Sequence, residues 1–185
     1  ALPRRIIAAV RFRGSELDPD ETLRAAGLRE NREITATALP EVSARVRRFY
    51  QKHGYPRATV SIEVTDTDDP MRVLVILVIQ AGAPRTVTRR RFMAWPDPKV
   101  IGLEPRLRQY DVSVGDRADQ ELLTQADRAL EKTLRERGWH RARVRHRLVP
   151  AAGSGVELVV IAHAGPLMRL RFEGNQHFDE TQLED

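Results

Sequence analysis

The sequence contains no cysteine, which excludes disulfide bonds, thiolate chemistry and cysteine-based zinc sites. Lysine is scarce too: only Lys52, Lys99 and Lys132 are lysines among the 31 Lys and Arg residues, which leaves 28 arginines. Aromatic residues make up only 5% of the chain. The longest uninterrupted apolar run spans residues 73–79, far short of the roughly 18–20 residues that a membrane-spanning helix needs.

Motifs of catalysis and cofactor binding are missing as well. The chain has no P-loop, no dinucleotide-binding fingerprint and no nucleophile elbow. Its five histidines lack metal-ligand spacing, and the acids at 66, 68 and 69 lack the glycine and glutamate of a calcium loop. We therefore expect no enzyme activity, no metal site and no cofactor.

The charge that is present is mostly arginine, and it exceeds the acidic charge by a formal +5. The planar guanidinium suits carboxylates and phosphates, so acidic partners, anionic head groups or nucleic acid are the expected ligands. An alternative is that the excess is a solvated surface from an arginine-biased coding sequence. The run at 89–91 lies on an expected strand without interleaved aromatics, which argues against nucleic acid.

An internal repeat is the main signal in the chain. Three signatures recur in the same order: RFRG at 11–14, as RFMA at 91–94 and RFEG at 171–174; GYPRATV at 54–60, as GWHRARV at 138–144; and AGAP at 81–84, as AGP at 164–166. Because the periods are all between 80 and 84 residues, the chain is predicted to hold two complete units and the start of a third. We expect domains at 1–84 and 85–165, and a truncated one at 166–185. The abrupt chain ends lead us to expect a longer parent protein.

Each unit predicts the order strand, helix, helix, strand, strand. In the first unit, residues 6–13 alternate as a half-buried strand does, and a helix with a cap and an early proline begins near 18–21 and ends near Gly27. A longer helix opens near 39–41 and ends at Gly54, and strands follow at 57–65 and 71–80. The corresponding elements of the second unit are expected at 86–93, 98–109, 119–137, 142–149 and 155–163. Because only a few residues join the units, we expect a semi-rigid rod.

This β-α-α-β-β unit resembles the POTRA domain. In that family the first strand ends in an apolar-x-Gly-Asn pattern followed by a phenylalanine, and residues 172–178 (FEGNQHF) fit this pattern closely. Residues 12–15 fit with serine for asparagine, whereas residues 92–95 lose the glycine. The Gly-Tyr at 54–55 and the Gly-Trp at 138–139 fit the family's helix-to-strand corner.

The resemblance implies an α+β fold of tandem POTRA modules, each a three-stranded mixed sheet with two helices on one face. It also implies a place, the periplasmic part of an outer-membrane protein of the BamA-like, TamA-like or two-partner secretion families. The implied partners are unfolded outer-membrane or secreted polypeptides, accessory assembly subunits, and a membrane β-barrel later in the parent chain. Contact with an anionic membrane surface is a further expectation.

In this topology the last strand is central, so the second strand of each unit forms an exposed sheet edge to which an extended client could add. A groove between that edge and the long helix would hold client side chains. The candidate binding residues are Arg57, Thr59, Ser61, Glu63, Arg141, Arg143, Arg145 and Arg147.

Other interpretations remain open at this stage. The four arginines of the second edge would bind acidic partners or head groups, or would simply prevent edge-to-edge aggregation. The modules could act as a rigid spacer that docks folded subunits. A nucleic-acid-binding repeat protein is a third reading, which predicts strongly salt-dependent affinity. Arg90 falls at a core-facing position, so we expect either a bulge in its strand or a side chain that reaches the edge of a pocket.

Overall fold

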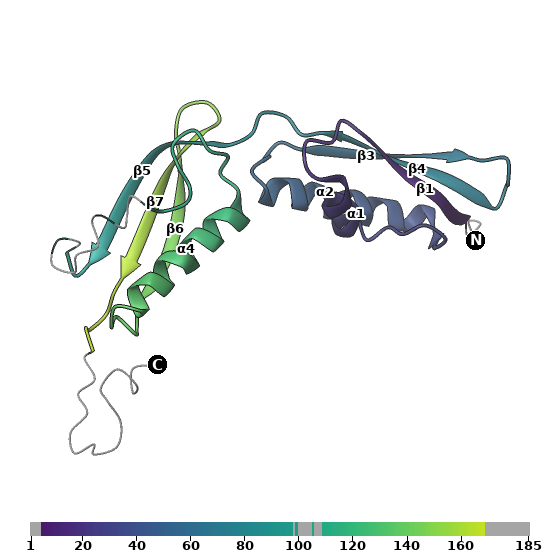
Figure 1. The fold of residues 1–185 in the computed structure, drawn as a ribbon. Coiled ribbons are helices and arrows are strands. Elements are labelled where there is room, and N and C mark those ends of the chain that lie inside the picture. Colours follow the sequence, from purple (N-terminus) through teal and green to yellow (C-terminus); the bar gives the residue numbers. More distant parts are fainter. Residues whose placement is uncertain (1–4, 98, 100–104, 106–108, 169–185) are drawn as a thin grey trace, which may run out of the picture.

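The computed structural model describes residues 5–97, 99, 105 and 109–168. Its strands form two separate sheets, ordered β2-β1-β4-β3 and β5-β7-β6. We call residues 5–80 the first module and residues 86–163 the second module. The modules follow one another in a bent rod, and the helices of both lie on the inner side of the bend (Figure 1). The expected α+β class is confirmed.

The first module begins with β1 (Arg5–Arg13) and α1 (Pro19–Ala26). The Asp18 carboxylate accepts the Glu21 N–H at 2.9 Å and starts α1, and Gly27, with φ +66°, ends it. After β2 (Glu33–Ile34) and a short 3-10 helix (Ala36–Ala38) comes α2 (Leu39–Lys52). The chain then forms β3 (Thr59–Asp66) and β4 (Arg72–Gln80).

The short strand β2 corrects the expectation of a three-stranded first sheet. It pairs antiparallel with β1, with Arg5 opposite Ile34 and Ile6 opposite Glu33. Ile34 is an apolar residue between the two helices, and it is buried in the first core. Burying this side chain draws the connection against β1 and adds a fourth strand.

The second module consists of β5 (Thr86–Trp95), α4 (Gln120–Arg135), β6 (Arg143–Pro150) and β7 (Gly155–His163). Its sheet has the three expected strands. The short helix expected at 98–109 and the third unit expected at 166–185 fall largely outside the described residues. The domain boundaries near residues 84 and 165 therefore remain a prediction.

Both sheets have the expected strand arrangement. The last strand of each module, β4 or β7, lies parallel to the first strand and antiparallel to the strand before it. Alternate residues of β4 are fully buried, and α2 covers them with Val42, Val46 and Tyr50 at helical spacing. The two modules bury separate apolar cores. No helix in the described part of the chain has the length and apolar character needed to cross a bilayer.

The first strand of each module carries a bulge at the equivalent place, between Ile7 and Ala9 in β1 and between Val87 and Arg89 in β5. Arg90 follows the second bulge, is half-buried, and donates to the carbonyls of Tyr110 and Val112 at 3.1 and 2.9 Å. The bulge expected in the strand of Arg90 is present, and its side chain reaches inward and donates to two loop carbonyls.

Candidate functional site

The strands β3 and β6 each form one edge of their sheet, and β2 and β5 form the opposite edges. Among the described residues, β3 pairs only with β4, and β6 pairs only with β7. An edge strand presents unpaired backbone groups that an added strand can bind. The structure thus places an edge where the sequence predicted one in each module.

Three of the candidate residues of the first edge lie on the open face of the sheet. Thr59, Ser61 and Glu63 alternate with inward-packed residues of β3 and are exposed on the sheet face away from the helices. Glu63 accepts from Arg13 at 3.2 Å across that face. Arg57 lies before the strand, which corrects the expected start at 57, because the Ala58 N–H donates to the Tyr55 carbonyl and closes a turn there.

The second edge has the same arrangement. Arg143, Arg145 and Arg147 are exposed and alternate with half-buried neighbours on β6. Arg141 lies in the turn before the strand, where the Ala142 N–H donates to the Trp139 carbonyl at 2.8 Å. The strand begins at Arg143 rather than at the expected 142, so Arg141 lies outside it and three exposed arginines form the row.

Hairpin bonds show which backbone groups point outward along each edge. Thr67 donates to the Arg72 carbonyl and Ala151 donates to the Gly155 carbonyl, in register with the ladders. Because antiparallel pairs alternate, odd-numbered residues of β3 and β6 bond to the central strand and even-numbered residues point outward. The outward sets are Val60, Ile62, Val64 and Asp66 on β3, and Val144, His146, Leu148 and Pro150 on β6.

Side chains of the long helices already occupy one end of each edge. Ser43 of α2 donates to the Val60 carbonyl at 2.6 Å. At the matching place in the second module, Glu131 of α4 accepts the Val144 N–H at 3.1 Å. At the other end of β6, Pro150 has no N–H to offer. Ser43 takes only the Val60 carbonyl, so among the described residues β3 keeps four outward N–H groups without a partner, whereas β6 keeps two.

The space between edge and helix also differs between the modules. In the first, an apolar cavity of about 200 Å³ lies between the start of α2 and β3, lined by Leu39, Val64 and Val73 among others. Val64 is 39% exposed, so the cavity is open beside the outward backbone groups. An ion pair between Arg5 and Asp66 stands at its rim.

In the second module a polar network fills the corresponding space. Asp127 of α4 lies 2.6 Å from Nδ1 of His146 on β6 and accepts from the Tyr110 hydroxyl, also at 2.6 Å. Gln120 contacts the other ring nitrogen of His146 at 2.8 Å. Burial, followed by the bond to Asp127, raises the pKa of Tyr110 far above its ordinary value. The network ties α4 to β6 and places polar side chains in the space between them.

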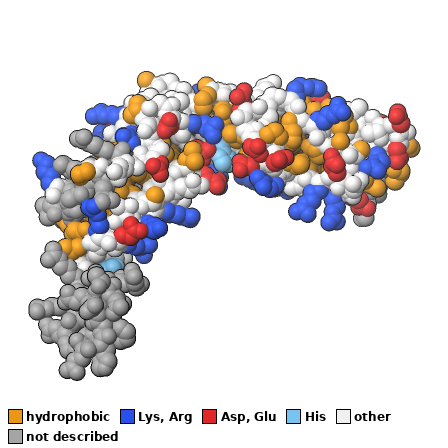
Figure 2. Space-filling model, viewed as in Figure 1, with side chains coloured by type: hydrophobic (Ala, Val, Ile, Leu, Met, Phe, Trp, Pro, Cys, Tyr) orange, Lys and Arg blue, Asp and Glu red, His pale blue; other side chains and the backbone are white. Residues whose placement is uncertain are grey.

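A second cluster joins the two modules. The Arg85 N–H donates to the Gly54 carbonyl at 2.7 Å, and the Arg85 carbonyl accepts the Ala118 N–H at 2.8 Å. Nδ1 of His53 lies 2.8 Å from the buried Asp119 carboxylate, which also accepts from Arg117 at 3.2 Å. Figure 2 shows acidic side chains gathered at this inner corner of the bend.

Asp119 has two roles in this junction. It accepts the N–H groups of Glu121 and Leu122 and so caps the start of α4. Burial alone would raise the pKa of Asp119, but hydrogen bonds from His53, from the backbone of Glu121 and from Arg117 hold it below its ordinary value. The carboxylate is thus charged, buried and shared between the modules.

The junction bond is repeated after the second module. The Met168 N–H donates to the Gly138 carbonyl at 2.9 Å, as Arg85 does to Gly54 one repeat earlier. Both glycines have positive φ, +88° and +90°. A Cβ on Gly54 would lie 2.7 Å from Cγ of Arg117, and one on Gly138 would lie 2.8 Å from the Met168 carbonyl oxygen. Glycine is therefore favoured at both corners by its backbone conformation and by the close approach of another segment.

Sequence reasoning identified the edges and the corner glycines, but it missed the network and the junction. Nothing in the sequence distinguishes Asp127 and Asp119 from other acidic residues of a predicted helix, and Tyr110 lies in a predicted loop. Their partners are 19 residues away for Asp127 and 66 for Asp119. Among the described residues, no group of acidic and histidine side chains is arranged to hold a metal ion.

Comparison with known proteins finds a match to one family model and similarity to several solved structures. Residues 6–82 match the POTRA family model, described as a surface antigen variable number repeat. The chain is similar to BamA POTRA3-5 of Haemophilus influenzae (20% identity, 98% of this chain, 76% of that chain, TM-score 0.49). It is also similar to POTRA1-3 of Omp85 from Anabaena (19%, 86%, 62%, 0.42) and to CdiB from Escherichia coli (13%, 86%, 27%, 0.37). No curated protein matches the chain.

Proposed function

We propose, on the premise that residues 6–82 are a POTRA domain, that this chain is the periplasmic polypeptide-binding scaffold of an outer-membrane assembly or translocation pore. POTRA is a family of non-catalytic scaffold domains. The same strand order and the same bulge support a second domain of this kind in residues 86–163. The proposed clients are unfolded outer-membrane or secreted polypeptides that bind as an added strand.

The observation that carries the proposal is the first edge. The outward N–H and C=O groups of Ile62 and Val64 have no partner among the described residues, and Val64 lines the apolar cavity beside Leu39. An extended client gains main-chain bonds there that do not depend on its sequence. Since strand side chains alternate, every second client residue faces the helix side, where one apolar group enters the cavity.

The second edge is the weaker candidate. Glu131 occupies the Val144 N–H, Pro150 offers no donor, and the network around His146 fills the groove. A client on β6 would have to displace a charged hydrogen bond, which costs about 1.5–3 kcal/mol. We therefore propose that clients bind first at β3.

The test is a titration of the ¹⁵N-labelled chain with a nine-residue peptide of alternating apolar and polar residues. We expect chemical-shift changes along β3 and around Leu39, with little change along β6. Ile62→Pro removes an outward N–H that makes no bond to β4. Ile62→Ala is the matched control, because it loses the same side chain and keeps the N–H.

We expect Ile62→Pro to weaken peptide binding by about tenfold relative to Ile62→Ala, since one main-chain bond contributes roughly 1 kcal/mol or more. A peptide N-methylated on alternate residues should lose binding when the methyl groups face β3. Equal binding by both variants, or shift changes confined to β6, would refute the proposal.

A spacer that docks folded accessory subunits is the second candidate function, and the junction favours it. Two backbone bonds and the buried Asp119 hold the modules together at a fixed corner. This reading predicts that a folded partner binds while extended peptides do not.

A further inference from the structure

The open face of the second sheet carries an unusual combination of side chains. We propose that this face, centred on Trp95, Arg145 and Arg147, is a docking surface for an anionic lipid membrane. The proposal extends the proposed function by naming a second partner, and it rests on that function only for the presence of a membrane nearby.

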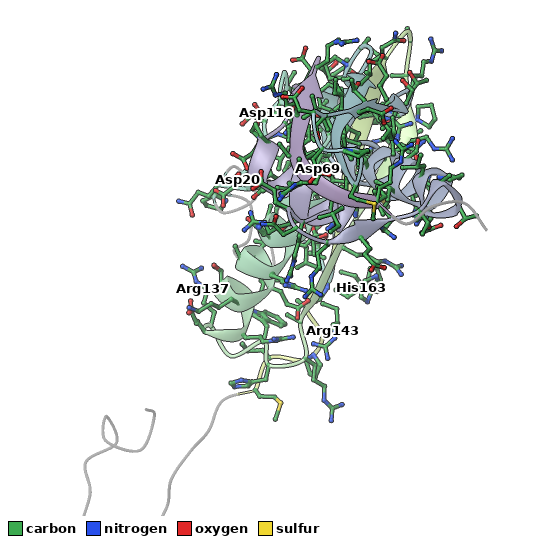
Figure 3. All side chains as sticks on the ribbon, turned by 90° about the vertical axis from the view of Figure 1, so that its right-hand side faces the viewer. Asp20, Asp69, Asp116, Arg137, Arg143 and His163 are labelled. Atoms are coloured by element: carbon green, nitrogen blue, oxygen red, sulfur yellow. The ribbon has the colours of Figure 1, made fainter. Side chains whose placement is uncertain are left out.

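The register places the side chains in rows across the sheet. Trp95 lies beside His163, which lies beside Arg143; Met93, Ile161 and Arg145 form the next row; Arg91, Val159 and Arg147 form the third. These positions lie on the face away from α4, because their even-numbered neighbours on all three strands pack into the core. The Arg143 guanidinium turns back around the edge and comes within 3.5 Å of Glu131 on α4. Figure 3 shows Arg143 and His163 together near the end of the second module.

The apolar part of this face is exposed. Trp95 is 75% exposed and Met93 is 52% exposed, on adjacent rows of β5. Large apolar side chains in such positions on a soluble surface mark a contact site. Indole rings concentrate at the boundary between membrane and water, because they combine an apolar body with a polar N–H.

The cationic part lies on the neighbouring edge strand. Arg145 and Arg147 have no acidic partner within the described ranges, and Arg143 has only a 3.5 Å contact with Glu131 while 70% of its side chain is exposed. Alternate residues of a strand repeat at about 6.7 Å, so the three arginine side chains leave β6 at regular intervals. Arginine binds phosphate groups with two parallel N–H donors.

The repeat provides an internal comparison. One period earlier, the positions of Arg143, Arg145 and Arg147 hold Thr59, Ser61 and Glu63, which are neutral or acidic. The positions of Met93 and Trp95 hold Arg13 and Ser15. The shared fold does not require this surface, so its chemistry is specific to the second module.

A lipid surface fits the face better than an acidic polypeptide does. The arginines, the tryptophan and the methionine stand on one sheet face in parallel rows, which a planar array of phosphates over an apolar layer can contact together. Each arginine near an anionic membrane contributes about 1 kcal/mol, so the three together raise affinity on the order of 100-fold.

The test is co-sedimentation of residues 1–185 with phosphatidylcholine vesicles that contain about 30% phosphatidylglycerol, and with pure phosphatidylcholine vesicles. We expect binding to the anionic vesicles only, and its loss when salt rises from about 0.1 M to about 1 M. Arg143→Ser/Arg145→Ser/Arg147→Ser should weaken binding on the order of 100-fold. The matched control, Arg29→Ser/Arg32→Ser/Arg47→Ser, removes the same charge from exposed positions of the first module and should weaken binding far less.

Fluorescence reports whether the apolar part enters the membrane. The chain has two tryptophans, and Trp95→Phe leaves only the half-buried Trp139. We expect a blue shift on adding anionic vesicles to the wild type and no shift in Trp95→Phe.

Four results would overturn the proposal. The first two are an equal loss of vesicle binding in both triple variants and the absence of a blue shift in the wild type. The other two are binding of an acidic Glu/Leu peptide without binding of vesicles, and self-association of Arg143→Ser/Arg145→Ser/Arg147→Ser with unchanged vesicle binding. The last result would assign the arginines to protection of the edge. Because Ile62→Pro should leave vesicle binding unchanged, failure at β3 and failure at this face are separable.

Discussion

Two aspartates begin helices in this chain, and replacing each by alanine measures what the junction contributes. Asp18 caps α1 and is exposed, whereas Asp119 caps α4, is 3% exposed, and also contacts His53 and Arg117. Losing a cap costs about 1 kcal/mol. Losing a buried charged hydrogen bond adds about 1.5–3 kcal/mol. We expect Asp18→Ala to lower the free energy of unfolding by about 1 kcal/mol and Asp119→Ala by about 3 kcal/mol.

Asp119→Asn separates the two contributions, because asparagine caps a helix as well as aspartate does. It should keep the cap and lose the charge-assisted bonds across the junction. Urea unfolding followed by tryptophan fluorescence reports the second module, which holds both tryptophans, and far-UV circular dichroism reports both modules. In the wild type the two signals should change together, and in Asp119→Asn the fluorescence transition should move to lower urea.

The pH dependence of stability has a definite sign. Since the folded pKa of Asp119 lies below its unfolded value, its contribution is present above about pH 4 and is lost as pH falls through the folded pKa. Asp119→Asn should flatten this part of the curve. Equal losses of unfolding free energy in Asp18→Ala and Asp119→Ala would refute the reasoning. So would an Asp119→Asn variant whose stability falls at low pH as steeply as that of the wild type.

Three further predictions concern the corner, the second edge and the polar network. Gly54→Ala should destabilise the chain by about 2–4 kcal/mol in thermal unfolding, against about 1 kcal/mol for Gly153→Ala, because both have positive φ but only Gly54 faces crowding atoms. Glu131→Ala combined with Pro150→Thr should free two outward N–H groups, and peptide-induced shift changes should then appear along β6; their absence would show that the groove itself is closed. Tyr110→Phe should cost about 1–3 kcal/mol in urea unfolding by leaving the buried acid of α4 short of a donor, while an unchanged stability would mean that water replaces the hydroxyl.

Much of the fold follows from local sequence. The period of 80–84 residues predicts the units, and the nearly continuous apolar run at 71–80 predicts the central strand. Proline and aspartate near residue 18 and glycine at 27 predict the ends of α1, because capping depends on neighbours within a few residues. The repeat and these local patterns can be seen along the chain itself, so the sequence by itself determined the elements that they predict.

Tertiary structure decided which backbone groups of the edge strands stay open. Ser43 reaches Val60 and Glu131 reaches Val144 across 17 and 13 residues, and these bonds determine which outward groups remain open. The sequence also could not show that the groove of the second module is filled, since that depends on where a loop tyrosine meets a helix acid. Contacts of this kind depend on how helices pack on sheets, so they cannot be predicted from the periodicity of a single strand. The sequence therefore determined that each module has an exposed edge strand, and packing decided that the two edges are not equivalent.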